Sequence, residues 1–367
     1  MIDGEYHIDR CCVFGNRASG AIWCTFYALV LWIGIFVKGL PDLLHYVDDA
    51  FSYEPDEELV YYGPYDSYYP RKQAALLQLF DEIGIPHEKK KQEFGRVLTI
   101  IGLEVSLPSM SIVMPEEKRH NLVNEVRQFI QDPARRHPLR DWQRILGYCN
   151  WSLNAYPLLR PALQSSYAKI RGKTIPLAPI RINKSVIQDM TWFTDRILST
   201  PGVNFLWSRC WDEGNAELNI LSDASNIGLA FWSPDLDIAF VTPINETEIR
   251  YGDTFFNEAL AVVSAIEWVI QLPNYPRRIL LHTDSMNTVD IFHSLAADPN
   301  YVLLLLHAVE IMMDFRIDIR VVHIPGSQNT VADALSRLLP EVAVRLRPGL
   351  RISTFSPPRD KLGPRRE

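Results

Sequence analysis

The sequence predicts a chain of several domains, of α/β and α+β class, with a mixed β-sheet in its C-terminal part. Its 367 residues exceed what one ordinary hydrophobic core organises, which indicates two or three domains. A hydrophobic content of 47% beside 22% charged residues is typical of globular proteins. From residue 204 to residue 339 the pattern is strand, strand, strand, helix, strand, helix, helix, strand, helix, which predicts an α/β domain.

The first region, residues 1–105, contains an uncharged apolar run over 21–37 that predicts a helix. This run lies at the lower edge of the length of a membrane span, and polar and aromatic residues interrupt it. We therefore favour a buried core helix over a transmembrane one and expect no membrane association. A hairpin around 46–51, a helix over 71–83 and a strand pair over 96–107 follow it.

The second region, residues 106–203, is predicted to be mostly helical and to serve as a spacer or clamp. Pro115 and the two glutamates after it indicate one helix start, and a second helix begins at Pro138. Four apolar residues recur at near-helical spacing in this second helix: Trp142, Ile145, Leu146 and Cys149. The last residues, 340–367, are rich in proline and arginine and are expected to form a disordered basic tail.

The charge and the cysteines limit the classes of protein and the compartment. A net charge of −7 argues against a protein that binds nucleic acid by general basicity, although basic residues are grouped at Lys89, Lys90 and Lys91 and in the tail. The first five residues are acidic and do not resemble a secretory signal. The five cysteines have no metal-ligand spacing, which favours reduced thiols of an intracellular protein, with cytoplasm and nucleus both open.

Four carboxylates of the third region lie at strand ends and helix starts. Asp223 and Asp284 end the predicted strands, while Glu258 and Asp333 lie early in predicted helices. Acids so placed can converge although they are far apart in sequence. A carboxylate cluster is costly unless cations neutralise it, and two divalent ions are the usual solution for phosphodiester cleavage. The quartet predicts a site for two Mg²⁺ or Mn²⁺ ions, although each acid alone could be an ordinary strand-end or helix-start residue.

A second acidic motif lies in the first region. In the segment Tyr46-Val47-Asp48-Asp49, two adjacent aspartates between apolar flanks suggest a tight hairpin that exposes its carboxylates. In a nucleotidyl transferase such acids hold the metals that bridge the incoming triphosphate and the primer hydroxyl. Because Asp-Asp is also an ordinary turn pair, a plain surface turn is the alternative.

These residues resemble motifs of the retrotransposon reverse transcriptases. The segment 46–49 resembles the metal-binding palm motif, and 3–20 resembles the nucleotide pocket with its palm helix. Residues 89–91 resemble a basic palm motif, 101–105 the strands that grip the primer end, and 140–168 the thumb and connection. The resemblance implies that Tyr46, Asp48 and Asp49 bind metal or nucleotide and that the three lysines bind nucleic acid.

The sequence departs from the pattern of this family in two respects. Ala21 stands where the pocket motif usually has a proline, and Asp3 and Asp9 fit poorly as the third metal-binding aspartate. The fingers and the first acidic strand are missing, so we expect a palm cut off at its N-terminus and no metal binding for polymerisation.

The third region resembles the ribonuclease H domain that follows the polymerase in such retroelements. Residues 222–225, 258–260 and 283–285 resemble its three acidic motifs, and 323–337 its closing segment. The resemblance, nearest to fungal retroelements, implies two-metal hydrolysis of RNA in RNA–DNA hybrids. One ion would be held by Asp223, Asp284 and Asp333, and the second by Asp223 and Glu258.

Three further kinds of residue have a predicted place. His323 is expected to be a structural or surface histidine. Asn329 is expected to cap the following helix or, alternatively, to contact nucleic acid. Four tryptophans are expected in core or edge packing: Trp207, Trp211, Trp232 and Trp268.

The sequence thus predicts a retroelement-derived fragment. It would comprise a partial palm over 1–105, a helical thumb and connection over 106–203, a ribonuclease H-like domain over 204–339 and the tail over 340–367. The expected activity is metal-dependent cleavage of hybrid RNA, with polymerase activity lost. An active RNA-directed DNA polymerase and a non-catalytic nucleic-acid-binding relic are the alternatives, and no protein partner can be inferred.

Overall fold

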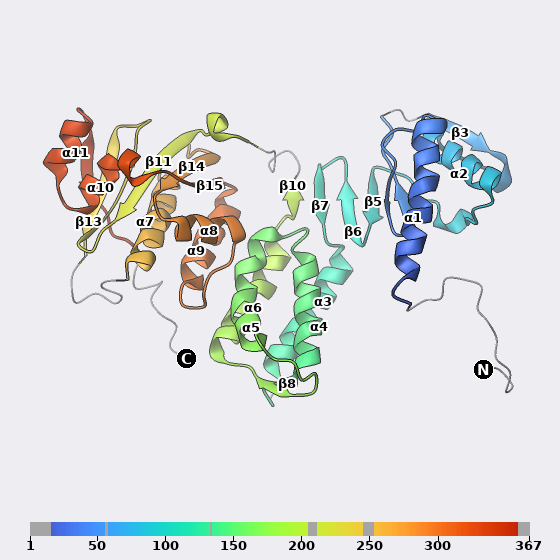
Figure 1. The fold of residues 1–367 in the computed structure, drawn as a ribbon, viewed down its shortest axis with the longest axis horizontal. Helices are drawn as coiled ribbons and strands as arrows, with labels where there is room; N and C mark the ends of the chain where they lie inside the picture. The colour runs from blue at the N-terminus through green and yellow to red at the C-terminus, as the bar shows by residue number, and fades with distance from the viewer. Residues whose placement is uncertain (1–15, 56–57, 133, 205–210, 245–252, 359–367) are drawn as a thin grey trace. The chain divides into compact units, whose positions relative to one another are not determined.

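The chain divides into two compact units, residues 1–109 and 110–367 (Figure 1). The computed structural model describes residues 16–55, 58–132, 134–204, 211–244 and 253–358. The mixed sheet that the sequence predicts is present in the second unit. The finer subdivision into palm, thumb and nuclease stays a prediction.

The first unit packs two helices against short antiparallel hairpins. Its core joins Tyr27 and Leu31 of the first helix to Leu77 of the second and to Tyr62 and Tyr69 of a hairpin. The predicted helix over 71–83 is confirmed to the residue, because Gly84 adopts the left-handed conformation that ends it. The elements are α1 Ser19–Trp32, β1 Leu44–Tyr46, β2 Asp49–Phe51, β3 Leu59–Tyr62, β4 Ser67–Pro70, α2 Arg71–Ile83, β5 Val97–Ile100 and β6 Leu103–Ser106.

Helix α1 is buried on one face only. Tyr27, Val30 and Leu31 are buried, and a π-helical turn, Ile33–Val37, continues the helix. The expectation of a buried core helix is wrong for the other face, where six large apolar side chains are about half exposed or more: Ile22, Phe26, Leu29, Trp32, Phe36 and Val37. By length and composition, the segment Ser19–Val37 is a candidate membrane span, with a mean hydropathy of 2.0. A signal sequence or a core helix of a soluble protein meets the same criterion.

The N-terminal part of the second unit is helical, as predicted. Helices begin directly after Pro115 and Pro138. Trp142, Cys149 and Phe193 are fully buried between the helices. The elements of this part are β7 Ser111–Val113, α3 Glu116–Gln131, β8 Arg136–Pro138, α4 Leu139–Ser152, α5 Gln164–Ile170, β9 Pro179–Arg181, α6 Lys184–Ser199 and β10 Val203–Asn204.

The rest of the second unit is built on a six-stranded mixed sheet in the order β15-β14-β11-β12-β13-β16. Only β12 runs opposite to the other strands. The predicted order of nine elements from 204 to 339 is confirmed. The elements are β11 Leu218–Ala224, β12 Gly228–Ser233, β13 Ile238–Pro243, α7 Thr254–Val269, β14 Arg278–Thr283, α8 Met286–Ser294, α9 Val302–Phe315, β15 Asp318–His323, α10 Thr330–Ser336, α11 Pro340–Leu346 and β16 Arg351–Thr354.

Helices cover both faces of this sheet (Figure 1). Successive side chains of a strand point to opposite faces. On β12, Phe231 therefore packs with α7 and α9, while Ala230 and Trp232 pack with α10 and α11. The predicted core role of the tryptophans is confirmed for Trp232, for buried Trp211 and for Trp268, which packs against the core; Trp207 lies outside the described residues.

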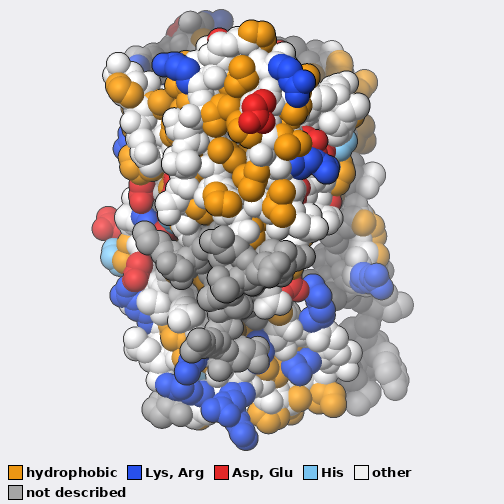
Figure 2. All heavy atoms as spheres, turned by 90° about the vertical axis from the view of Figure 1, so that its left-hand side faces the viewer, with side chains coloured by type: hydrophobic (Ala, Val, Ile, Leu, Met, Phe, Trp, Pro, Cys, Tyr) orange, Lys and Arg blue, Asp and Glu red, His pale blue; other side chains and the backbone are white. Residues whose placement is uncertain are grey.

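The expectation of a disordered tail from residue 340 is wrong as far as β16. This strand pairs in parallel with β13, and Ala343 of α11 and Leu350 are buried in the core under α10. Arg347 donates from Nε to Asp237 at 2.7 Å. The composition of this segment, rich in arginine and proline, therefore gave no indication that its few apolar residues pack into the core. Figure 2 shows hydrophobic side chains gathered beside basic ones on the face where α11 lies.

The helical part is more than a spacer, because α6 is joined to α9. The indole of Trp192 donates to Glu310 at 2.7 Å, and Arg196 donates to Asp314 at 2.7 Å. Trp192 also packs against a small apolar cluster that contains Leu305 of α9. These contacts connect the helical part to the helix layer of the sheet within one unit.

Candidate active site

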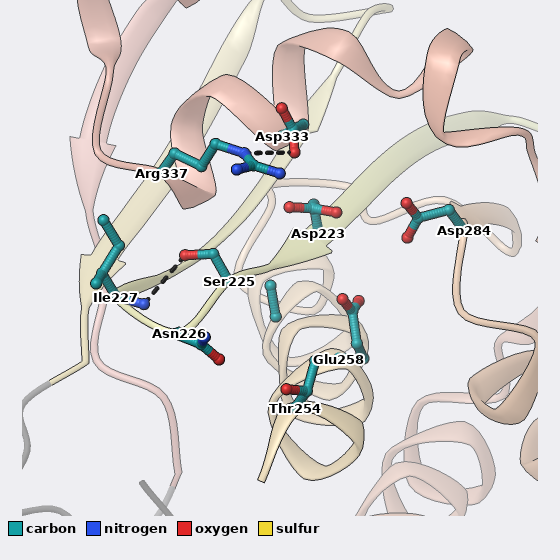
Figure 3. Close-up of a pocket in the computed structure, with 10 residues that line it drawn as sticks. Asp223, Ser225, Asn226, Ile227, Thr254, Glu258, Asp284, Asp333 and Arg337 are labelled. Atoms are coloured by element: carbon teal, nitrogen blue, oxygen red, sulfur yellow. Dashed lines mark hydrogen bonds and ion pairs between the residues drawn. The ribbon is translucent and has the colours of Figure 1, made fainter. Parts of the chain in front are cut away.

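Three of the four predicted acids meet at one end of the mixed sheet (Figure 3). One carboxylate oxygen each of Asp223, Glu258 and Asp284 lies within 4.8 Å of the other two. Asp223 lies near the end of β11 and Asp284 directly follows β14, and these strands are parallel neighbours, so both acids emerge at the same edge. Glu258 comes from the first part of α7, which packs against β11. Residues 258 and 284 are thus brought to residue 223 by the topology.

The fourth acid, Asp333, lies at the rim of the same cavity rather than in the triad. The cavity has a volume of about 450 Å³. Asp333, which lies in α10, and Arg337, which directly follows α10, both line it. The Nε of Arg337 donates to Asp333 at 2.7 Å, and both side chains are about half exposed. Uncharged polar groups complete the rim: Ser225, Asn226 and Thr254.

The pKa of Asp223 is raised by burial and lowered by two neighbouring side chains. The side chain is 5% exposed, and burial raises its pKa to about 6. The hydroxyl of Ser336 opposes this rise, as does the guanidinium of Arg337, whereas the charges of Asp284 and Asp333 add to it. A bound cation would relieve the charge repulsion that the neighbouring acids impose.

Glu258 shows most directly that the site suits a cation. Its side chain is 7% exposed, and burial together with the charges of Asp223 and Asp284 raises its pKa to about 9. Its Oε2 is buried and has no hydrogen-bond partner within the described part of the chain. A buried carboxylate oxygen without a donor is costly. Oxygen ligands at such short separations suit a hard divalent cation, which Asp223, Glu258 and Asp284 could hold together, and Asp333 lines the same cavity.

Contacts across the sheet position Asp223. The buried hydroxyl of Ser336 donates to the carboxylate of Asp223, and the Ser225 hydroxyl donates to the backbone oxygen of Ser336 at 2.7 Å. A Cβ at Gly228 would lie 2.5 Å from that same backbone oxygen, so only glycine fits the start of β12. None of these roles was predicted. Ser336 is 113 residues from its partner, so no local sequence signal indicates the pair.

Asn329 makes a contact that the sequence did not predict. Its side chain is fully buried and makes no capping hydrogen bond to α10, and its contact with nucleic acid stays a prediction. Instead, Nδ2 donates to the backbone oxygen of Ser222 at 2.9 Å. Asn329 thus joins the start of α10 to β11 next to Asp223. His323 is exposed at the end of β15, as predicted.

The second acidic motif forms the expected hairpin in the first unit. Tyr46 pairs with Asp49, and the side chains of Tyr46, Asp48 and Asp49 are exposed. Among the described residues, the acids that could jointly hold a metal are Asp223, Glu258 and Asp284, and Asp48 and Asp49 do not belong to such a group. Burial and the charges of Asp48 and Asp49 raise the pKa of Tyr27 to about 12. Asp3 and Asp9 lie outside the described residues.

The remaining predicted groups are surface lysines and free thiols. Lys89, Lys90 and Lys91 form one exposed helical turn, and Lys90 is paired with Glu88 at 2.9 Å. Their binding of nucleic acid stays a prediction. Cys149 is a buried free thiol whose pKa burial raises, and Cys24 is also free. Three cysteines lie outside the described residues: Cys11, Cys12 and Cys210.

Neither a protein-family model nor a curated protein sequence matches this chain. Among solved structures it is similar to a foamy viral protease-reverse transcriptase dRH in complex with ds DNA (TM-score 0.38, 15% identity, 84% of this chain and 50% of that chain). A foamy viral protease-reverse transcriptase in complex with RNA/DNA hybrid has a TM-score of 0.38 and 14% identity, over 84% of this chain and 38% of that one. RNase H1 from the halophilic archaeon Halobacterium salinarum NRC-1 has a TM-score of 0.27 and 17% identity, over 34% of this chain and 97% of that one. This chain spans half or less of these two reverse transcriptase chains, and at such values the likeness is remote.

Proposed function

We propose that the sheet-based part of the second unit is a two-metal nuclease that hydrolyses RNA in RNA–DNA hybrids. The observation that supports it best is the triad Asp223, Glu258 and Asp284, which each offer one oxygen within 4.8 Å of the others. In addition, the buried Oε2 of Glu258 has no hydrogen-bond partner among the described residues. The motifs around these acids resemble those of retroelement ribonucleases H. The proposal therefore includes a retroelement origin.

The residues of the site divide the work by position. Two bound Mg²⁺ or Mn²⁺ ions would activate a water for attack on the phosphodiester and stabilise the departing 3′ oxygen. Asp223 lies between the other acids and would be the group that both ions share (Figure 3). Asp284 and Asp333 would hold the ion on one side, and Glu258 would help to hold the other.

The preference for RNA would come from the uncharged rim. Ribose 2′-hydroxyls both donate and accept hydrogen bonds, and a protein distinguishes RNA from DNA by contacts to them. Asn226 and Thr254 line the cavity and offer such groups. Asn287 of α8 lines the adjoining hollow beside Glu258 and Asp284. These side chains would place hydrogen-bonding groups beside the acids.

The test compares labelled hybrid, duplex DNA and single-stranded RNA with the full chain in Mg²⁺ or in EDTA. We expect cleavage of the hybrid RNA only in Mg²⁺, with a loss of at least about 100-fold for Asp284→Asn, because a ligand is removed. Asp290→Asn is the matched control, since Asp290 is an exposed acid of α8 outside the cavity. Equal cleavage by wild type, Asp284→Asn and EDTA-treated protein would refute the proposal.

A polymerase function has weaker support. The exposed pair Asp48 and Asp49 has no further acid that groups with it among the described residues. In a primer-extension assay with template and dNTPs we expect no product from this chain. Extension that is lost in Asp48→Asn would establish the polymerase instead, and metal-independent hybrid binding without cleavage would indicate a relic.

A further inference from the structure

Arg337 is a positively charged group fixed at the rim of an otherwise acidic cavity. It directly follows α10, one helical turn after Asp333, and its Nε donates to Asp333 at 2.7 Å (Figure 3). The guanidinium lines the cavity together with Asp223, Glu258 and Asp284. Its charge acts on Asp223 as well, because it opposes the rise in that pKa.

The ion pair sets Asp333 apart from the other three acids. The inner triad can receive a cation without breaking any ion pair in the described chain, because its three oxygens face one another and Glu258 Oε2 has no partner. Asp333 is already engaged by Arg337. A second cation at Asp333 must therefore displace the guanidinium or share the carboxylate with a like charge, which Coulomb repulsion opposes.

The displacement is physically easy. Side chains of Arg337 and Asp333 are 60% and 43% exposed, so the guanidinium can move into solvent without crossing packed atoms. Exposed ion pairs of this kind contribute little, so exchange with a divalent cation is reversible. A buried pair would block the site, whereas this one only competes for it.

We propose that Arg337 is a positioning residue that competes with the outer metal ion for Asp333, so that the site fills in two steps. The inner position fills first, and the outer one fills only when the guanidinium leaves the carboxylate. This inference rests on the proposed two-metal site. It concerns the order and affinity of binding and can fail while the metal site itself stands.

The test is a Mn²⁺ titration of the full chain without nucleic acid, in which electron paramagnetic resonance measures the free ion. We expect the wild type to bind one ion tightly and a second weakly. Arg337→Gln strengthens the second site by about fivefold, the scale of an exposed ion pair, and leaves the first site within about twofold. The matched control is Arg347→Gln, which removes an Arg–Asp pair of the same 2.7 Å Nε–Oδ1 distance, away from the cavity.

A second pair of variants separates competition from general electrostatics. In an Asp333→Asn background the weak site is lost, and adding Arg337→Gln then changes nothing. Three results would overturn the competition. The affinity of the second site could be unchanged in Arg337→Gln, or both proteins could bind one ion only. The affinity could also rise in Arg337→Gln even when the Asp333 carboxylate is absent. No Mn²⁺ binding, or binding that Asp223→Asn leaves intact, would overturn the proposed metal site instead.

Discussion

The raised pKa values of Glu258 and Asp223 make the stability of the metal-free protein depend on pH. Folding raises the pKa of Glu258 from 4.5 to about 9 and the pKa of Asp223 from 3.8 to about 6. The stability that these two groups contribute is therefore fully present below about pH 4, where both are protonated in either state. It is lost as the pH rises through their pKa values in the folded protein. We expect the free energy of unfolding in EDTA to fall from about pH 4 to about pH 9, as urea denaturation would measure.

Glu258→Gln supplies the control for this prediction. The amide carries no charge at any of these pH values, so the decline should be much shallower in this variant. Asp290→Asn, on the exposed side of α8, should keep the slope of the wild type. If Glu258→Gln and wild type decline in parallel, Glu258 is not the group whose ionisation destabilises the fold.

Ser336 should matter for both stability and metal binding. Ser336→Ala removes a buried hydroxyl that donates to the Asp223 carboxylate, and a bond to a charged group is worth about 1.5–3 kcal/mol. We expect a stability loss of that order at neutral pH and weaker Mn²⁺ binding. Ser264→Ala is the control, because Ser264 is equally buried but donates only to the backbone of its own helix α7. Equal effects of both changes on Mn²⁺ affinity would contradict a positioning role for Ser336.

At the residue scale the sequence indicated the acids but not what supports them. Asp223 and Asp284 could be selected because each directly ends an apolar strand pattern. The residues that contact β11 at Asp223 could not be selected in this way. Ser336 and Asn329 are more than a hundred residues away in the sequence and reach β11 only in the folded chain. Arg337 was visible beside Asp333 in the closing motif, yet its contact requires the helical turn that places the two side chains together.

At the scale of elements, prediction succeeded where local signals agreed. Helix α2 combines an amphipathic pattern with a glycine end, and β14 is an apolar run that ends at an acid. Prediction failed where composition and pattern conflicted. Residues 340–354 are basic and proline-rich but fold because Ala343 and Leu350 meet a complementary core. Helix α1 is apolar on all sides, so its sequence could not show that one face stays exposed.

The contact between α6 and α9 gives a prediction at this scale. Trp192→Phe keeps most of the apolar ring but removes the hydrogen bond to Glu310, which should cost about 1–3 kcal/mol because the acceptor is charged. In a double-mutant cycle with Glu310→Gln, urea unfolding should report coupling between the two positions. Trp151→Phe on α4 is the control. Additive losses would show that the contact does not join the helical part to the sheet.

At the scale of the whole molecule, the sequence indicated a change of pattern near residue 204 but not the contacts that cross it. Residues 110–367 form one compact unit, although their sequence pattern changes from helical to α/β near residue 204. The secondary structure does change from helical to α/β near residue 204, but ion pairs such as Arg196–Asp314 connect the two parts. Such contacts join residues 118 positions apart, and no periodicity in the sequence indicates them.

The strand β16 has a practical consequence for how this protein can be shortened. It covers the backbone of β13, which would otherwise end the sheet with unpaired amide and carbonyl groups. A chain stopped at residue 339 should lose this cover and expose the apolar side of α10, so we expect it to self-associate. Light scattering after gel filtration would compare it with a chain stopped at residue 358; equal masses would contradict the expectation. Residues 340–358 would then protect this edge of the sheet from association with another chain.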